Sequence, residues 1–315
     1  MVRRVSVLLT VVIVALATSP LLVSARASRQ GTPVVTTAAS KSRTGASDST
    51  IVPVATLALP AQRDAAALLV DLQQLVAGSG GAVGLTVVEL GGTDQLAWSV
   101  DGDAVFTAAS TYKLVALMME AQNIAAGTTD PNGLVCYIES DYEEGWFDDY
   151  SPGACFTRNE LASRAAKESD NTAGHMLVRD VGGASALNAW AAAAGATNSA
   201  FFEGNTTTAT DLATLWVAEA SGELGGAIAQ AWLDPLLTDT TTEAGVPAGT
   251  PAETTVVHKT GALDAVENDA ALVTSGPDGD YVIVVMTDGL GGAAGWQLIA
   301  GISAAVWQTE LSRPQ

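Results

Sequence analysis

The fold of this chain is decided by residues 106–119, which read FTAASTYKLVALMM. Small residues here follow a β-type residue and lead into an unbroken apolar run, which predicts a strand or loop entering a helix. Ser110 then lies in the first turn of that helix, and Lys113 follows three residues later. Because positions i and i+3 share one helical face, the Lys113 amine can reach the Ser110 hydroxyl.

This pairing suits nucleophilic catalysis by Ser110. A serine hydroxyl is a weak nucleophile until a neighbouring base takes its proton. Lys113 can act as that base if burial lowers the pKa of its amine, and a helix N-terminus also disfavours positive charge. A Ser-x-x-Lys spacing is common in ordinary helices as well, so its meaning depends on the rest of the chain.

Two further short motifs follow this stretch. Residues 169–171 read Ser-Asp-Asn, and residues 259–261 read Lys-Thr-Gly at the end of the β-rich run 254–258. The three motifs, in this order, are typical of class A β-lactamases and penicillin-binding proteins. They predict acyl transfer through a serine ester, with Ser110 as the nucleophile.

Charge is unevenly distributed along the 315 residues, whose formal net charge is −20. Six of the 14 Lys and Arg residues fall in the first 43 positions, and only seven lie between residues 61 and 312. So acidic a domain repels nucleic acid and anionic membrane surfaces. Two of the seven, Lys113 and Lys259, belong to the motifs, which favours a site for an anionic substrate.

The first 59 residues precede the predicted domain. Residues 1–27 look like an export signal, with Arg3 and Arg4 before an apolar run and a small-residue cleavage site at 25–27. An uncleaved membrane anchor is the alternative, because apolar character resumes after the first run. Residues 28–59, rich in Ser, Thr and Ala, are predicted to be a flexible linker. We therefore expect a secreted or cell-surface protein.

The hydrophobic pattern of residues 60–312 predicts one α+β domain. Terminal helices are predicted at 61–77 and 293–311, and the segment from about 105 to 235 is largely helical. The predicted strands cover residues 83–90, 96–100, 254–258, 270–274 and 281–286. Two strands early and three late predict a five-stranded antiparallel sheet flanked by the terminal helices, with an inserted all-helical lobe.

Cys136 and Cys155 are the two cysteines of the sequence. In an exported chain an even pair predicts a disulfide, and the alternative is two separate buried thiols. The bridge would close a short loop and contribute roughly 3 kcal/mol in the chain-entropy model. Because the loop contains Trp146, Phe147 and Tyr150, we expect it to rim the cleft. Two histidines and two cysteines make no plausible zinc cluster, so no metal or other cofactor is expected.

With these motifs, residues 60–312 resemble the class A β-lactamase-like serine hydrolases. The resemblance is carried by the three motifs, by residues 150–152 (Tyr-Ser-Pro) and by residues 267–269 (Glu-Asn-Asp). It implies that Ser110 is acylated and that Lys113 is its base or proton relay. It also implies that Ser169 passes a proton to the leaving nitrogen.

The resemblance further implies how a substrate is held. Asn171 would bind the amide side chain of the substrate, and Lys259 and Thr260 would hold its carboxylate. The backbone N–H groups of the nucleophile and of Ala262 would form the oxyanion hole. Tyr150 matches the aromatic residue that stacks at the cleft mouth. The predicted substrate contacts are thus Tyr150, Asn171, Thr260, Gly261 and Ala262.

One loop departs from the class A pattern. Class A enzymes carry a Glu-x-x-Leu-Asn loop, whose Glu activates the water that clears the acyl-enzyme, over ten residues before an Asp-Thr-Thr-Thr stretch. Residues 205–208 (Asn-Thr-Thr-Thr) look like that stretch, and only Ala-Phe-Phe-Glu-Gly precedes them at 200–204. Glu203 is the one carboxylate that offers a substitute deacylation base. Without a positioned base the ester hydrolyses slowly, since such a base contributes about 10²–10⁴-fold.

The number of basic residues near the third motif also differs from the class A pattern. Class A sites usually add an Arg from the strands to grip the substrate carboxylate, but after Lys259 the only Lys or Arg is Arg313. Lys259 is therefore expected to bind that carboxylate largely alone, with His258 either beside it or facing away. We expect weaker ground-state binding of β-lactams. His175, which follows the second motif, is expected to be a packed or surface helix residue.

These features predict an exported serine hydrolase of the class A β-lactamase type, which opens β-lactams or similar cyclic amides through a Ser110 ester and deacylates slowly. The enzymatic alternative is a D-Ala-D-Ala-type peptidase acting on cell-wall peptides, which the missing loop Glu motivates. An alternative of another class is a penicillin-sensing binding module that stays acylated. We expect small-molecule partners, no nucleic acid, a membrane only through an uncleaved signal, and a monomer.

Overall fold

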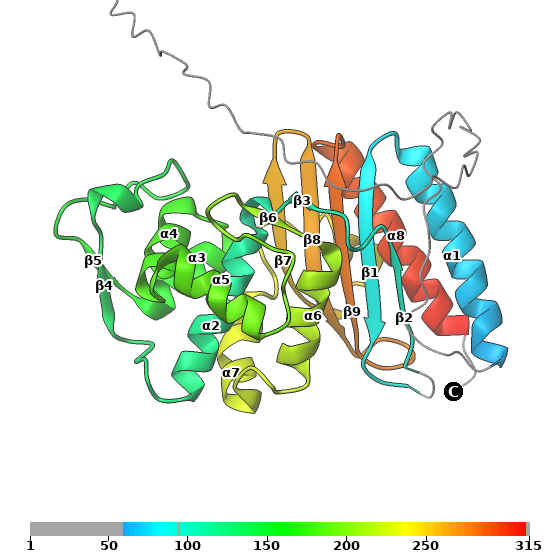
Figure 1. Ribbon diagram of the computed structural model, residues 1–315, viewed down its shortest axis with the longest axis horizontal. Helices are drawn as coiled ribbons and strands as arrows, with labels where there is room; N and C mark the ends of the chain where they lie inside the picture. The colour runs from blue at the N-terminus through cyan, green and yellow to red at the C-terminus, as the bar shows by residue number, and fades with distance from the viewer. Residues whose placement is uncertain (1–58, 93–94, 313–315) are drawn as a thin grey trace, which may run out of the picture. The chain divides into compact units, whose positions relative to one another are not determined.

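The computed structural model describes residues 59–92 and 95–312 (Figure 1). The predicted export signal (1–27) and all but the last residue of the predicted linker (28–59) lie outside these described residues. Within them, every helix is too short or too polar to cross a membrane.

A five-stranded antiparallel sheet organises the domain, with the strand order β2-β1-β9-β8-β7. The strands are β1 (Ala82–Glu89), β2 (Ala97–Val100), β7 (Thr255–Leu263), β8 (Val266–Thr274) and β9 (Tyr281–Asp288). The predicted sheet is confirmed, but β7 and β8 are longer than predicted. They pair residue by residue up to a tight turn, because backbone hydrogen bonding continues where the apolar pattern ends. Residues 260–262 and 267–269 consequently face each other across one ladder.

The sheet buries both of its faces, as the alternation along β9 shows. Val282 and Val284 belong to the core shared with the helical lobe, whereas Ile283 and Val285 belong to the core under the terminal helices. Successive side chains of a strand point to opposite faces, so one strand serves both cores. Burying each such side chain contributes roughly 1.5–3 kcal/mol.

The two terminal helices, α1 (Leu59–Ser79) and α8 (Ala293–Ser312), lie side by side beside the sheet (Figure 1). Leu72 of α1 and Ile299, Ile302 and Val306 of α8 are fully buried in the core that they share with the strands. The predicted covering of the sheet by the terminal helices is thereby confirmed.

The segment between β2 and β7 forms the lobe that carries the first two motifs, and the third lies on β7 itself. Its helices are α2 (Tyr112–Ala125), α3 (Arg158–Lys167), α4 (Asn171–Asp180), α5 (Gly183–Ala193), α6 (Ala209–Ala220) and α7 (Gly226–Leu233). Short 3₁₀ turns are η1 (Ala109–Thr111), η2 (Glu139–Asp141), η3 (Asp234–Leu236) and η4 (Val246–Gly249). α2 is central to the lobe, because Leu114 to Met118 are all buried.

The prediction of an all-helical lobe missed two small sheets. β3 (Phe106–Thr107) pairs with β6 (Thr206–Thr207), and β4 (Leu134–Cys136) pairs with β5 (Cys155–Thr157). Two or three residues are too few to show an alternating pattern in the sequence.

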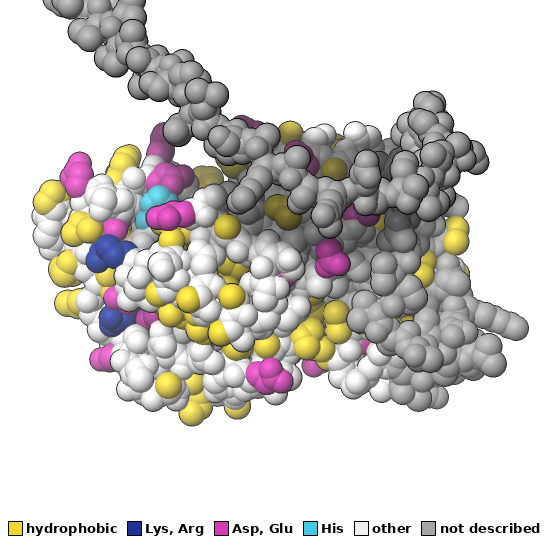
Figure 2. All heavy atoms as spheres, viewed as in Figure 1, with side chains coloured by type: hydrophobic (Ala, Val, Ile, Leu, Met, Phe, Trp, Pro, Cys, Tyr) yellow, Lys and Arg dark blue, Asp and Glu magenta, His cyan; other side chains and the backbone are white. Residues whose placement is uncertain are grey.

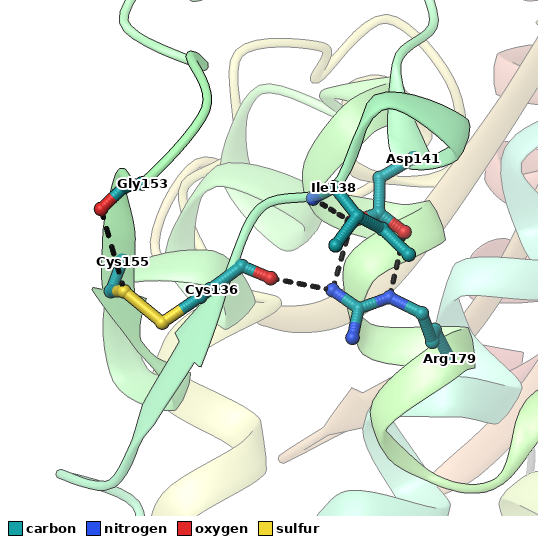
Figure 3. The surroundings of a disulfide bond; sticks show 6 residues. All are labelled: Cys136, Ile138, Asp141, Gly153, Cys155 and Arg179. Atoms are coloured by element: carbon teal, nitrogen blue, oxygen red, sulfur yellow. Dashed lines mark hydrogen bonds and ion pairs between the residues drawn. A yellow bond between two sulfur atoms is a disulfide. The ribbon is translucent and has the colours of Figure 1, made fainter.

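Cys136 and Cys155 are joined by a disulfide across the β4–β5 pair, as predicted (Figure 3). The bridge closes the loop formed by residues 136–155, which is also bound to α4. Arg179 of α4 donates to the Cys136 carbonyl at 2.8 Å and forms an ion pair with Asp141, also at 2.8 Å. Figure 3 shows the guanidinium lying between the disulfide strand and the turn that carries Asp141.

Candidate active site

Ser110 lies in the η1 turn, directly before α2. Its Oγ accepts a hydrogen bond from Lys113 Nζ at 2.9 Å, so the contact expected from the i,i+3 spacing is confirmed. The preceding residue, Ala109, has a positive φ of 48°, a conformation that is strained for a side chain with a Cβ. Asn205 holds this turn by donating from Nδ2 to the Ala109 carbonyl at 3.1 Å.

Lys113 is buried among polar partners from the second motif. Its Nζ lies 2.6 Å from the Ser169 carbonyl oxygen and 2.7 Å from Asn171 Oδ1. Burial lowers the pKa of the Lys113 amine to about 8, although the charges of Asp170 and Glu143 act in the opposite direction. An amine with this pKa has a substantial neutral fraction near pH 8, which a base for the serine hydroxyl requires.

Ser169 connects the two motif lysines. Its Oγ accepts from Lys259 Nζ at 2.9 Å and lies 3.4 Å from Lys113 Nζ. Burial, together with the nearby charge of Lys113, holds the pKa of the Lys259 amine well below its usual value. The predicted catalytic set, Ser110, Lys113, Ser169 and Lys259, is therefore brought together as one connected group of hydroxyls and amines.

Asp170 builds the turn on which Ser169 is presented. Its buried carboxylate caps α4 by accepting from Ala173 N at 2.8 Å, and it also accepts from Trp146 N at 3.0 Å. Ser169 itself has a positive φ of 59°. Because of this cap, α4 begins at Asn171, and the Asn171 side chain is oriented toward Lys113.

Tyr150 does not have the predicted place at the cleft mouth. Its hydroxyl donates to Asp170 Oδ1 at 2.7 Å, and its ring packs edge-on against Phe156 with 5.2 Å between the ring centroids. The phenol is thus bound to the second motif, and Tyr150 is not among the residues that line the cleft beside Ser110. The prediction that Tyr150 stacks on the substrate is therefore corrected.

The third motif approaches the nucleophile through its backbone. A Cβ on Gly261 would lie 2.7 Å from the Ala108 carbonyl oxygen and 3.1 Å from Ser110 N, so only glycine fits. Ser110 and Ala262 both line the same cleft, as the predicted oxyanion hole requires. From the neighbouring strand, Asn268 donates to the Thr107 carbonyl at 2.9 Å and steadies the segment that leads to the nucleophile.

The cleft beside Ser110 has a volume of about 360 Å³. It is lined by Ala109, Ser110, Tyr112, Glu143, Asn171, His175, Phe202, Asn205, Ala262 and Leu263. Of the predicted substrate contacts, Asn171 and Ala262 are in this lining. Thr260 and Gly261 precede Ala262 on the same strand, and Lys259 reaches Ser169 from it.

Glu143 and His175 are cleft residues that sequence reasoning missed. His175 Nε2 lies 2.9 Å from Glu143 Oε2, and the other carboxylate oxygen of Glu143 accepts from Asn171 Nδ2 at 3.1 Å. His175 is a partly buried residue of α4 that packs against Phe202, as expected, and it also lines the cleft. A signal was present, because His175 follows Asn171 by four positions and so shares its helical face.

The shortened loop brings an aromatic ring to the cleft in place of a carboxylate. Phe202 lines the cavity, and its ring lies edge-on to His175 with 5.0 Å between centroids. Glu203, the predicted substitute base, is exposed and is not in the cleft lining. The tight turn that places Phe202 inward, with a φ of 69°, directs Glu203 outward, and this corrects the prediction.

His258 faces away from the predicted carboxylate site. Its fully buried ring lies 2.9 Å from Asp269 Oδ1 and 3.2 Å from Glu243 Oε1. Burial lowers the pKa of His258, but the two carboxylates raise it more, to about 9. Because neighbouring residues of a strand face opposite sides, Lys259 reaches Ser169 and His258 does not.

Comparisons with known proteins agree with this arrangement. The sequence matches the model of the Beta-lactamase enzyme family over residues 67–309. No match was found among curated proteins.

Many solved structures resemble the domain, and three of them illustrate the similarity. PBP-A has 28% identity and a TM-score of 0.70, covering 77% of this chain and 95% of that one. A PBP-A mutant, solved as an acyl-enzyme complex with penicillin G, has 29% identity and a TM-score of 0.70, covering 77% and 96%. A β-lactamase from Sphaerobacter thermophilus has 25% identity and a TM-score of 0.69, covering 79% and 99%. Since the family model matches most of the chain, the chain belongs to the Beta-lactamase enzyme family and is a class A β-lactamase-like serine hydrolase.

Proposed function

We propose that the protein opens β-lactams by forming an ester between Ser110 Oγ and the carbonyl carbon of the cyclic amide. The observation that carries this proposal is the hydrogen bond of 2.9 Å from Lys113 Nζ to Ser110 Oγ. With a pKa of about 8, Lys113 can take the hydroxyl proton as the oxygen attacks. Backbone N–H groups of Ser110 and Ala262 then stabilise the negative oxygen of the tetrahedral intermediate.

Collapse of the intermediate requires a proton on the leaving nitrogen. Ser169 is suited to deliver it, because its hydroxyl lies between Lys113 at 3.4 Å and Lys259 at 2.9 Å. Ser169 donates its own proton to the nitrogen and regains one from a neighbouring amine. The carbon–nitrogen bond breaks, the ring opens, and the acyl group stays on Ser110.

The substrate carboxylate is assigned to the third motif. Lys259 supplies positive charge there, and Thr260 supplies a hydroxyl donor. His258 adds little, since its ring is enclosed by Asp269 and Glu243. A single amine with a lowered pKa supports weak ground-state binding of the carboxylate.

Slow release of the acyl group is the second part of the proposal. Among the residues that line the cleft, Glu143 is the one carboxylate, and its oxygens accept from His175 and Asn171. Phe202 occupies the part of the shortened loop that faces the cavity. Water therefore reaches the ester without a dedicated base, which costs about 10²–10⁴-fold in rate.

A D-Ala-D-Ala-type peptidase is the second candidate function. A peptide that ends in D-Ala-D-Ala presents an amide followed by a carboxylate, which are the groups that Ser110 and Lys259 would meet in a β-lactam. Phe202 in place of a carboxylate favours this candidate, because rapid hydrolysis of a penicilloyl ester is then unnecessary.

We also propose that the protein is exported. Residues 1–27 have the pattern of an export signal, and a disulfide such as Cys136–Cys155 persists in oxidising compartments. Fractionation of the producing cells, with N-terminal sequencing of the mature protein, tests this. Recovery of the unprocessed chain in the cytoplasm would contradict it.

Intact-protein mass spectrometry after mixing with benzylpenicillin tests the acylation chemistry. The expected result is a covalent adduct at Ser110 that persists, and no adduct on the Ser110→Ala variant. Rapid return to the free mass with hydrolysed product would contradict slow deacylation and indicate an efficient β-lactamase. A persistent adduct together with release of D-Ala from a D-Ala-D-Ala peptide would select the peptidase, and no peptide cleavage would select a sensing module. The absence of any adduct would reject the shared mechanism.

A further inference from the structure

The site beside the nucleophile contains both positive and negative side chains. Lys113 and Lys259 lie together around Ser169, and Lys259 is the residue assigned to the substrate carboxylate. Glu143 lines the cavity, in contact with Asn171 and His175. Figure 2 shows acidic side chains gathered beside a histidine on the face of the helical lobe.

We propose that the cleft selects substrates that carry an ammonium group on the acyl side of the scissile amide, with Glu143 as the residue that recognises it. The preferred substrate is then a zwitterion, with its carboxylate at Lys259 and its ammonium at Glu143. This inference rests on the proposed function, because it concerns the same Ser110 ester.

Glu143 has capacity for such a ligand. A carboxylate offers about four lone-pair directions, and an ammonium group offers three donors. Oε2 is 2.9 Å from His175 Nε2 and Oε1 is 3.1 Å from Asn171 Nδ2, one contact for each oxygen. The side chain is 53% exposed, so its remaining lone pairs are accessible from the cleft.

The contact with Asn171 places the Glu143 carboxylate near the acyl side chain of the substrate. Its Oδ1 accepts from Lys113, and its Nδ2 donates to Glu143. Asn171 is the residue expected to meet the amide side chain of the substrate. A cationic group attached to that side chain, beyond the amide, therefore comes within reach of Glu143.

The basic groups that face Glu143 are His175, 2.9 Å away, and Lys113, which is joined to it through Asn171. The arginines of the neighbouring helices are already paired, Arg164 with Asp149 at 2.6 Å and Arg179 with Asp141 at 2.8 Å. The charge of Glu143 also reaches the catalytic groups, since it acts to raise the pKa of Lys113. A ligand cation at Glu143 thus meets no arginine there, and it shares the carboxylate with His175.

The walls between the nucleophile and Glu143 are apolar. Tyr112 and Phe202 form one wall, with ring centroids 5.5 Å apart, and Leu263, 52% exposed, contributes from β7. A cavity of about 360 Å³ accommodates a small apolar or aromatic group. An aromatic acyl group with an α-ammonium substituent matches both the walls and the charge.

Benzylpenicillin and ampicillin form a matched pair for the test, because ampicillin adds an α-amino group to the same aromatic acyl chain. Acylation rates of both are measured at about pH 6, below the ordinary α-amino pKa of roughly 7.7–8.0, and at low salt. We expect ampicillin to acylate Ser110 about three- to fivefold faster, as for a partly exposed ion pair. Glu143→Gln should remove this preference. Asp148→Asn, which removes an exposed charge from the same loop, should keep it.

The pH dependence of the wild-type protein gives a second readout that needs no variant. The preference should disappear as the pH rises through the pKa of the ligand amine, because the ammonium is lost. Equal rates for the two penicillins, or a preference that survives Glu143→Gln or high pH, overturn this inference and leave the proposed function standing. If neither penicillin forms an adduct, the proposed function fails and this inference fails with it.

Discussion

Lys259 Nζ donates to Ser169 Oγ at 2.9 Å, although the two residues are 90 positions apart in the chain. This contact joins the third motif to the second, and Lys113 joins the second to the first. Positive charge in this position is costly, because Lys259 is buried and its neighbour Lys113 is also an amine. A buried amine that is tied to a reactive hydroxyl and not to a carboxylate indicates a functional contact.

Lys259→Ala should abolish acylation by benzylpenicillin. The change removes both the partner of Ser169 and the charge assigned to the substrate carboxylate, so the loss combines binding and proton transfer. The measurement is the rate of adduct formation by mass spectrometry, with thermal unfolding to confirm that the variant folds. His258→Gln serves as the matched control, because His258 is the neighbouring residue on β7 and its side chain faces Asp269 and Glu243. Full acylation by a folded Lys259→Ala protein would defeat the assignment.

The acylation rate should rise with pH up to about pH 8 and then level off. Only the neutral Lys113 amine can accept the Ser110 proton, and burial lowers its pKa to about 8. Glu143→Gln should move this inflection to lower pH, since the charge of Glu143 acts to raise the Lys113 pKa. A pH–rate profile measured with an uncharged-side-chain penicillin checks both statements. An inflection near the ordinary pKa of a lysine, or one that stays at the same pH in the Glu143→Gln variant, would argue against Lys113 as the base.

Glu203→Gln should leave the lifetime of the acyl-enzyme unchanged. Its side chain is exposed, and Phe202 takes the inward position of the same loop. Adduct decay followed by mass spectrometry gives the rate, and Asp148→Asn controls for the general effect of one surface charge. Slower decay in the Glu203 variant alone would restore this residue as a deacylation base.

Local sequence patterns were sufficient for the sheet and for the nucleophile. Hydrophobic periodicity depends on neighbouring residues, and so does the i,i+3 reach of Lys113 to Ser110. The extent of β7 was missed because Lys-Thr-Gly interrupts the apolar run while backbone pairing with β8 continues. That the three motifs meet in one cleft was predicted from the family resemblance, because no local sequence pattern indicates which distant segments lie together.

The acyl side of the cleft depends on tertiary contacts and was not predicted. Glu143 reaches it because its backbone is bound by Thr172, and Trp146 N is bound by Asp170. Tyr150 was placed wrongly for the same reason, since an aromatic ring near a motif says nothing of where its hydroxyl finds an acceptor. The position of His175 could have been predicted from the sequence, because its helical spacing from Asn171 puts both residues on one face of α4.

The contribution of His258 to stability should fall as the pH rises from about 6.5 to about 9, whereas the lowered pKa values of the Lys113 and Lys259 amines change stability in the opposite direction. His258 has its pKa raised from 6.5 to about 9 in the folded protein, so its contribution is complete below 6.5 and is lost through 9. The buried acid Glu219, with its pKa raised to about 8, changes stability in the same direction, because its charged form is disfavoured on folding. One pKa unit corresponds to about 1.4 kcal/mol, so the His258 part is on the order of 3–4 kcal/mol.

Urea unfolding at several pH values measures this slope. His258→Gln should flatten the part of the slope between pH 6.5 and 9, and Glu219→Gln should flatten the part below pH 8. His175→Gln is the matched control, because that imidazole lines the cleft beside the exposed carboxylate of Glu143. A pH dependence that His258→Gln leaves unchanged between pH 6.5 and 9, or that Glu219→Gln leaves unchanged below pH 8, would contradict the prediction.

Reduction of the Cys136–Cys155 disulfide should lower stability but preserve the acylation chemistry of the folded protein. The two cysteines are 19 positions apart, and closing a loop of this length contributes roughly 3 kcal/mol in the chain-entropy model. The loop keeps its attachment to α4 without the bridge, through Glu143 and Thr172 at 2.8 Å and through Trp146 and Asp170 at 3.0 Å. Urea unfolding and benzylpenicillin acylation, each with the double Cys→Ser variant, separate the two effects. An acylation rate that falls in proportion to stability would show that the bridge itself maintains the cleft.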